Sequence, residues 1–122
     1  MYGAERWKNL EVWKLADALA HKVYAASKAL PKEELYGLTS QLRRAALSVP
    51  TNIVEGYSRK GDKELARFVG ISLGSLGETA YLLHFSKDLG YISEEEYIKL
   101  EPLLNELGAK LWNFSQTVRG EK

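Results

Sequence analysis

The most constraining feature of the sequence is a row of large apolar residues near its carboxyl end, repeated at alternating intervals of three and four positions. The row consists of Tyr97, Leu100, Leu104, Leu107, Leu111, Phe114 and Val118. Because an α-helix has about 3.6 residues per turn, this spacing places all seven side chains on one stripe. A lone helix cannot bury such a stripe, so the segment predicts a long helix that packs against other helices.

Three earlier segments repeat the helical periodicity, and no segment alternates polar and apolar residues with the period of a strand. Pro31 is expected to end the first segment and Gly90 the third. The connections are short, which favours antiparallel neighbours. The sequence predicts one domain and an all-α fold, an antiparallel up-down-up-down four-helix bundle. The domain spans residues 1–122, with helices at about 10–30, 38–57, 62–89 and 94–118.

Polar residues at the breaks predict how the later helices begin. Thr39 or Ser40 can cap the second helix, because a hydroxyl accepts a hydrogen bond from an otherwise unpaired backbone N–H group. Asp62 can cap the third helix in the same way. Ser93 and Glu96 have the spacing of a capping box at the start of the fourth helix.

The sequence lacks the patterns of the common catalytic and metal sites. It has no cysteine, and neither of its two histidines follows a glutamate by three positions, as metal-binding bundles require. Asp17 and His21 could hold a metal weakly, but this spacing is typical of an ordinary surface pair on a helix. Gly70, Gly74 and Gly77 follow no strand, so they predict no phosphate-binding loop. We therefore expect no enzymatic activity, no cofactor and no metal.

Composition favours a soluble cytoplasmic protein without a membrane segment. The first nine residues lack the apolar stretch of a signal peptide, and no run approaches the roughly 20 apolar residues of a membrane span. The net charge is +1. Residues 1–70 hold 12 basic against 8 acidic side chains, and residues 71–122 hold 5 against 8. This asymmetry is compatible with a weakly basic face or with ordinary solvated helix surfaces.

Small residues form a ridge along the third helix. Gly70, Gly74 and Gly77 each cost a helix roughly 1 kcal/mol relative to alanine. With Ser72 and Ser75 they leave a smooth surface that another helix can approach closely. The ridge therefore favours close helix–helix contact, and simple tolerance of the glycines is the alternative.

The second helix is apolar over more than half of its circumference. At about 100° per residue, its polar side chains fall on one narrow arc. They are Gln41, Arg44, Ser48, Asn52, Glu55 and Arg59. Leu47 and Val54 lie outside the main apolar stripe. A helix on the surface of a monomer usually has less apolar surface, so we expect a second contact beyond the core of one chain.

Arg43 interrupts the apolar arc of the second helix. A buried charge there would need a partner, for which Glu78 is the first candidate and Glu55 the second. Alternatively, the Arg43 side chain extends to solvent.

Several motifs resemble a bacterial family, the four-helix-bundle proteins encoded within intervening sequences of 23S ribosomal RNA genes. The longest runs from Gly37 to Ala46 and continues through Ser48-Val49-Pro50, Asn52-Ile53 and Glu55-Gly56. Further matches are Leu10-Glu11-Val12-Trp13, Leu30-Pro31, Arg67-Phe68, Gly74-Ser75-Leu76 with Glu78, and Leu89-Gly90-Tyr91-Ile92. The resemblance covers about residues 10–111.

The resemblance implies a left-handed antiparallel bundle that assembles into a ring-like homopentamer. It also implies kinship with the accessory protein of diversity-generating retroelements, a basic pentamer that binds a reverse transcriptase and nucleic acid. This chain differs from that relative in being nearly neutral. The resemblance implies no catalytic residue.

Two functional hypotheses follow for an oligomer of this kind. In the first, the protein is an accessory factor that binds RNA or DNA through Arg59, Lys60, Lys63 and Arg67, with Arg44 on the polar arc. In the second, it is a scaffold that binds an unknown protein partner, and the basic residues only keep a turn solvated. Self-association is expected in both.

Overall fold

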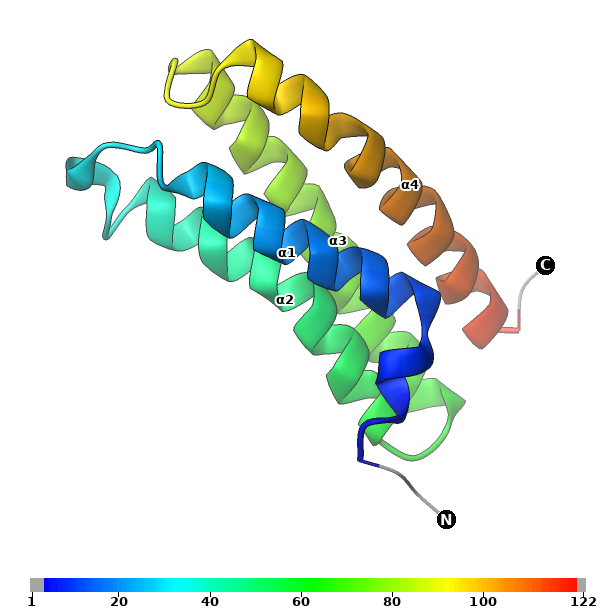
Figure 1. The fold of residues 1–122 in the computed structure, drawn as a ribbon. Helices are drawn as coiled ribbons and strands as arrows, with labels where there is room; N and C mark the ends of the chain where they lie inside the picture. Colours follow the sequence, from blue (N-terminus) through cyan, green and yellow to red (C-terminus); the bar gives the residue numbers. More distant parts are fainter. Residues whose placement is uncertain (1–3, 121–122) are drawn as a thin grey trace.

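The computed structural model describes residues 4–120, and its four long helices run antiparallel along the chain (Figure 1). The five terminal residues of the predicted 1–122 domain lie outside that range. The elements are η1 (Arg6–Asn9), α1 (Glu11–Ser27), η2 (Lys32–Glu34), α2 (Leu38–Ser58), α3 (Asp62–Asp88) and α4 (Glu94–Val118). The prediction of an all-α four-helix bundle is therefore confirmed.

The helices occupy the four corners of a square in chain order. Contacts pair α1 with α2, α2 with α3, α3 with α4 and α4 with α1, and the described residues show no contact across either diagonal. The contact between α2 and α3 is the most extensive. The bundle thus has four outer faces, each formed by two adjacent helices, and α2 belongs to both the α1–α2 face and the α2–α3 face.

The predicted first helix, at residues 10–30, is too long. Helix α1 ends at Ser27, and the chain then tightens into a turn in which Ala29 and Leu30 donate backbone hydrogen bonds to residues three positions earlier. Pro31 follows this turn with an extended backbone, and a proline disfavours the helical conformation in the residue before it, so the helix ends ahead of Leu30. Helix α2 runs through Pro50 without ending, as its apolar pattern predicts.

Two of the three predicted helix caps are wrong. Thr39 and Ser40 lie inside α2, whose N-cap is Gly37; instead, the carboxylate of Glu34 accepts a hydrogen bond from the backbone N–H of Leu38 at 3.3 Å. Asp62 is already the first residue of α3, because the positive φ of Gly61, 88°, lets the chain turn into the helix there. The Ser93 cap is confirmed, since its hydroxyl accepts a hydrogen bond from the Glu96 N–H at 3.1 Å.

Glu34 also ties the two turns at one end of the bundle together. Its other carboxylate oxygen accepts a hydrogen bond from the Tyr91 hydroxyl at 3.1 Å, so one side chain links η2 to the α3–α4 turn. Burial raises the pKa of the Tyr91 phenol above its ordinary value, and the hydrogen bond to Glu34 adds to this effect.

Helices α3 and α4 fill the core with different side chains. Helix α4 contributes Leu100, Leu104, Leu107 and Leu111, all buried as the sequence predicts. Helix α3 buries Ser72, Thr79 and Ser86 among its apolar residues, and each hydroxyl donates to a backbone carbonyl at 2.8 Å. Among the described residues, no buried side-chain nitrogen or oxygen lacks a hydrogen-bond partner. The hydroxyls of α3 are therefore buried in the core without leaving polar groups unpaired.

Candidate interaction surface

Large apolar side chains line the solvent side of α3. Ile71 is 42% exposed, Tyr81 is 60% exposed, and Phe85 and Leu89 are also exposed. At about 100° per residue, Tyr81 lies nearly opposite the buried hydroxyls, whereas Ile71 and Leu89 flank the buried side. Ile71, Tyr81 and Phe85 were not predicted to form a site, although the spacing of four positions from Tyr81 to Phe85 and on to Leu89 could have indicated a second apolar row.

The predicted glycine ridge lies on this same exposed side. A methyl group added at Gly70, Gly74 or Gly77 would meet nothing within 4 Å, so none of the three contacts another helix of the chain. The close approach of α2 and α3 occurs at Gly56 instead, where an added Cβ would lie 2.8 Å from the Cβ of Phe68. Contact between the glycine ridge and a second chain stays a prediction.

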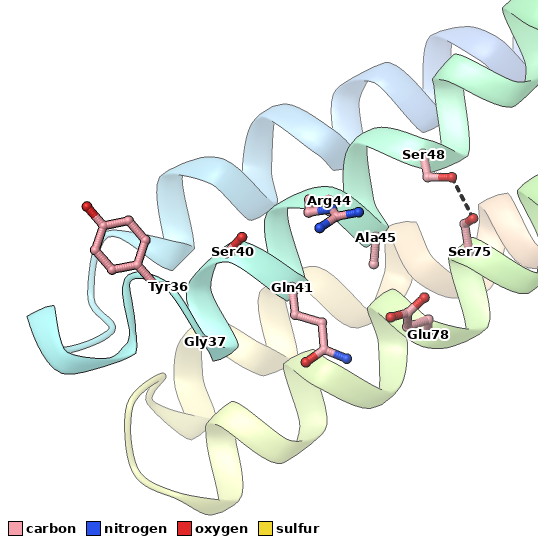
Figure 2. Close-up of a pocket in the computed structure, with 9 residues that line it drawn as sticks. All are labelled: Tyr36, Gly37, Ser40, Gln41, Arg44, Ala45, Ser48, Ser75 and Glu78. Atoms are coloured by element: carbon pink, nitrogen blue, oxygen red, sulfur yellow. Dashed lines mark hydrogen bonds between the residues drawn. The ribbon is translucent and has the colours of Figure 1, made fainter.

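A polar groove of about 560 Å³ separates the exposed side of α3 from α2 (Figure 2). A contact of 2.7 Å between the hydroxyls of Ser48 and Ser75 marks one end of it. Arg44 extends from α2 and Glu78 from α3, and neither has a hydrogen-bond or ionic partner among residues 4–120. The lining residues are Tyr36, Gly37, Ser40, Gln41, Arg44, Ala45, Ser48, Ser75 and Glu78.

Arg43 does not pair with Glu78 or Glu55, so that hypothesis is wrong. Its Nε donates a hydrogen bond to the Ser27 hydroxyl at 2.8 Å, and its guanidinium lies 5.3 Å from the centre of the Tyr24 ring. Arg43 therefore faces α1 and not α3. Arg43 is partly buried in these contacts and partly exposed, so the alternative of a side chain that extends to solvent stays a prediction.

An apolar groove of about 250 Å³ lies on the α1–α2 face, on the other side of α2. It is lined by Asp17, Ala20, His21, Tyr24 and Leu47. Leu47 is 49% exposed, so it lies outside the core as the apolar excess of α2 predicts, whereas Val54 is partly buried. Helix α2 is thus flanked by a polar, charged groove towards α3 and by an apolar groove towards α1.

Carboxylates neutralise the two arginines of the predicted basic cluster at the α2–α3 turn. Arg59 forms ion pairs with Glu55 at 2.9 Å and with Glu64 at 3.7 Å, and Arg67 pairs with Glu64 at 3.5 Å. Both guanidinium groups also lie over the ring of Phe68, at 5.1 and 4.4 Å from its centre. The two arginines therefore hold the α2–α3 turn together.

Two lysines of the cluster keep free charges. Lys60 and Lys63 are exposed and have no ionic partner within the described part of the chain. Arg44 is not brought to them, because fifteen helical residues separate it from Arg59, a distance of roughly 22 Å. The structure brings four of the five predicted nucleic-acid-binding residues to one turn and leaves the fifth in the α2–α3 groove.

The two histidines of the chain each lie beside one aspartate. His21 lies 3.5 Å from Asp17, which confirms the predicted surface pair, and His84 lies 3.4 Å from Asp88. Across residues 4–120 there is no group of three or more histidine, cysteine, aspartate or glutamate side chains that could hold a metal ion. None of the described helices combines the length and the apolar character that crossing a membrane requires.

Comparisons with known proteins agree with this architecture. One similar solved structure is that of a protein of unknown function from the S23 ribosomal protein family of Bacteroides thetaiotaomicron. The two share 21% sequence identity and superpose with a TM-score of 0.79 over 86% of this chain and 98% of that one, which shows a common fold. No curated protein sequence matches the chain. The model of the 23S rRNA-intervening sequence protein family matches residues 8–113, and the chain therefore belongs to that family.

Proposed function

We propose that the protein is a non-catalytic interaction scaffold that assembles with copies of itself through the outer face of α3. The observation that carries this proposal is the exposure of Ile71, Tyr81 and Phe85 on α3, a helix that also buries an apolar face of its own in the core. Single exposed apolar residues are normal on a monomer, but several on one helix are typical of an interface.

The glycine ridge supports the same proposal. Gly70, Gly74 and Gly77 lower helix stability, and no contact within the chain offsets that cost. A partner helix lying on the ridge would offset it, because small residues allow close packing of two helices. The family resemblance adds the expected number of copies, five in a ring.

Light scattering combined with size-exclusion chromatography tests the proposal. We expect the native chain at micromolar concentration to have a mass several times its 13.7 kDa. Ile71→Glu should reduce the assembly to monomer, because it places a carboxylate in the apolar row. Ile98→Glu on α4 is the matched control, since Ile98 is 55% exposed and lies on another helix. A monomeric native chain would refute the proposal.

Nucleic-acid binding is a second candidate function, favoured by the free charges of Lys60 and Lys63. A ring would repeat this weak site in every copy and so raise its total affinity. We expect labelled RNA to bind at about 50 mM salt and to dissociate as salt rises, because phosphate contacts release counterions. The double variant Lys60→Glu, Lys63→Glu should lose binding while its mass is unchanged. Equal binding by the variant and the native chain would exclude this function.

A further inference from the structure

The groove between α2 and α3 has the size of a small-molecule site. Its volume of about 560 Å³ lies within the range of about 300–1,000 Å³ that is usual for ligand pockets in proteins. Ala45 lies between Arg44 and Glu78 in Figure 2, and its small, buried side chain leaves the space between the two charges open. Most of the other lining side chains are polar, so the groove suits a polar ligand.

Arg44 differs from every other arginine of residues 4–120 in having no interaction within the chain. The other five each have one: Arg6, Arg43, Arg59, Arg67 and Arg119. A guanidinium group presents five N–H donors in a planar fork, which matches a carboxylate with two parallel hydrogen bonds. Arg44 can therefore hold a carboxylate that comes from outside the chain.

Glu78 supplies the opposite charge from the α3 side of the groove. Both side chains are exposed, and they form no ion pair with each other or with another described residue. A ligand with a single charge would be attracted by one of them and repelled by the other. A ligand that carries both a carboxylate and an ammonium group can turn each of its charges towards the opposite charge of the groove.

Neutral side chains of the groove also have unused hydrogen-bonding capacity. The hydroxyls of Ser48 and Ser75 are 2.7 Å apart, and only one of their two hydrogens can lie between them. The other hydrogen has no acceptor within the described part of the chain. The Gln41 amide also has no partner there, and it offers both N–H donors and a C=O acceptor. These groups match a ligand side chain that ends in an amide or a hydroxyl.

From these groups we infer that the α2–α3 groove binds a free α-amino acid with an amide or hydroxyl side chain. Arg44 pairs with the α-carboxylate and Glu78 with the α-ammonium group, while Gln41 bonds to the side chain. The inference goes beyond the proposed self-association and does not depend on it, because one chain supplies every group of the site.

Isothermal titration calorimetry of the native chain with L-glutamine, L-asparagine and L-serine tests the inference. We expect at least one of the three to bind at low salt. L-leucine should not bind, because its side chain would leave the polar groups of the groove without partners. The absence of binding by all three polar amino acids would overturn the inference, and so would equal binding of L-leucine.

Two analogues of the amino acid that binds best separate the contributions of its charges. The N-acetyl derivative lacks the ammonium charge, and the carboxamide lacks the carboxylate charge. Each should bind about tenfold more weakly, because each loses one charge-assisted contact. Equal binding of the amino acid and both analogues would contradict recognition of a zwitterion.

Two variants assign these charges to residues. Arg44→Gln should no longer distinguish the amino acid from its carboxamide, and Glu78→Gln should no longer distinguish it from its N-acetyl derivative. Both positions are exposed, so both variants should keep native circular dichroism. Lys63→Gln and Glu101→Gln remove exposed charges outside the groove and are the matched controls, which should bind as the native chain does.

Unchanged binding by Arg44→Gln and Glu78→Gln, or an equal loss in the two controls, would overturn the inference. Light scattering is a separate readout of self-association. A native chain that is monomeric and binds the amino acid would therefore refute the proposed function and leave the inference standing.

Discussion

Helices α3 and α4 have similar lengths, 27 and 25 residues, but they differ in the polar residues that they bury and in the apolar residues that they expose. Helix α4 buries a row of leucines with Ser115, and its five glutamates are exposed together with Ile98 and Trp112. Helix α3 buries three hydroxyls beside five large apolar residues and turns isoleucine, tyrosine and phenylalanine to solvent. The comparison teaches that both helices complete the core, and that α3 exposes its apolar residues beside a glycine ridge that nothing in the chain covers.

The buried hydroxyls of α3 lie among its large core residues, and each of them has a backbone acceptor. Thr79 and Ser86 donate to carbonyls of their own helix, and Ser72 donates to the Val49 carbonyl of α2. The closest approach of α2 and α3 is at Gly56, where an added Cβ would lie 2.8 Å from the Cβ of Phe68. The outer face of α3 is then free to serve a different contact.

The largest expected effect lies in the leucine row of α4. Leu107 is fully buried, so Leu107→Ala should lower the free energy of unfolding by about 2–5 kcal/mol through lost burial and an internal cavity. Denaturant unfolding measures this loss. The folded variant should keep the native mass in light scattering, because the proposed interface lies on α3. A folded variant with a reduced mass would place the interface on α4 and would contradict the assignment of the uncovered apolar face to α3.

The next effect concerns the closest approach of α2 and α3. Gly56→Ala forces a methyl group to 2.8 Å from the Cβ of Phe68, which cannot move without its backbone. Overpacking of this kind should cost about 1–3 kcal/mol in thermal or denaturant unfolding, even though alanine has the higher helix propensity. An unchanged midpoint would mean that the two helices can separate freely.

A smaller effect is expected at the hydroxyl that joins the two helices. Ser72→Ala removes the hydrogen bond to the Val49 carbonyl and should cost about 1 kcal/mol in denaturant unfolding. Leu107→Ala provides the scale for comparison in the same experiment. A loss as large as that of Leu107→Ala would show that α3 depends on its hydroxyls as α4 depends on its leucines.

The smallest effect has the opposite sign. Gly74→Ala adds a methyl group that meets nothing within 4 Å in the chain, so it should stabilise the dissociated bundle by about 0.5–1 kcal/mol through helix propensity. The same methyl group should weaken self-association, because it fills the space that a partner helix needs. Unfolding at nanomolar protein and light scattering at micromolar protein separate the two effects. Stronger association of Gly74→Ala would contradict the account.

The features predicted correctly from sequence are those set by local spacing. The leucine row of α4, the Ser93 cap and the bundle topology all depend on residues within a few positions of one another. The errors are of two kinds. The partner of Arg43 is Ser27 of α1, sixteen positions away, which no helical spacing reveals. The caps of α2 and α3 and the end of α1 are local, and they were missed by one to three residues because the turn backbone at Gly37, Gly61 and Pro31 sets them. The Arg59 pair with Glu64 likewise depends on the geometry of the α2–α3 turn.

The central claim, that another copy covers the outer face of α3, can be tested directly because the chain has no cysteine. Ile71→Cys and Ile98→Cys place single thiols on α3 and on α4, and both original side chains are exposed in one chain, by 42% and 55%. The rate of maleimide labelling reports whether each thiol is accessible. The account predicts that Ile98→Cys reacts rapidly at every protein concentration, whereas Ile71→Cys is protected at micromolar protein and becomes reactive on dilution. Equal, concentration-independent labelling of the two variants would contradict it.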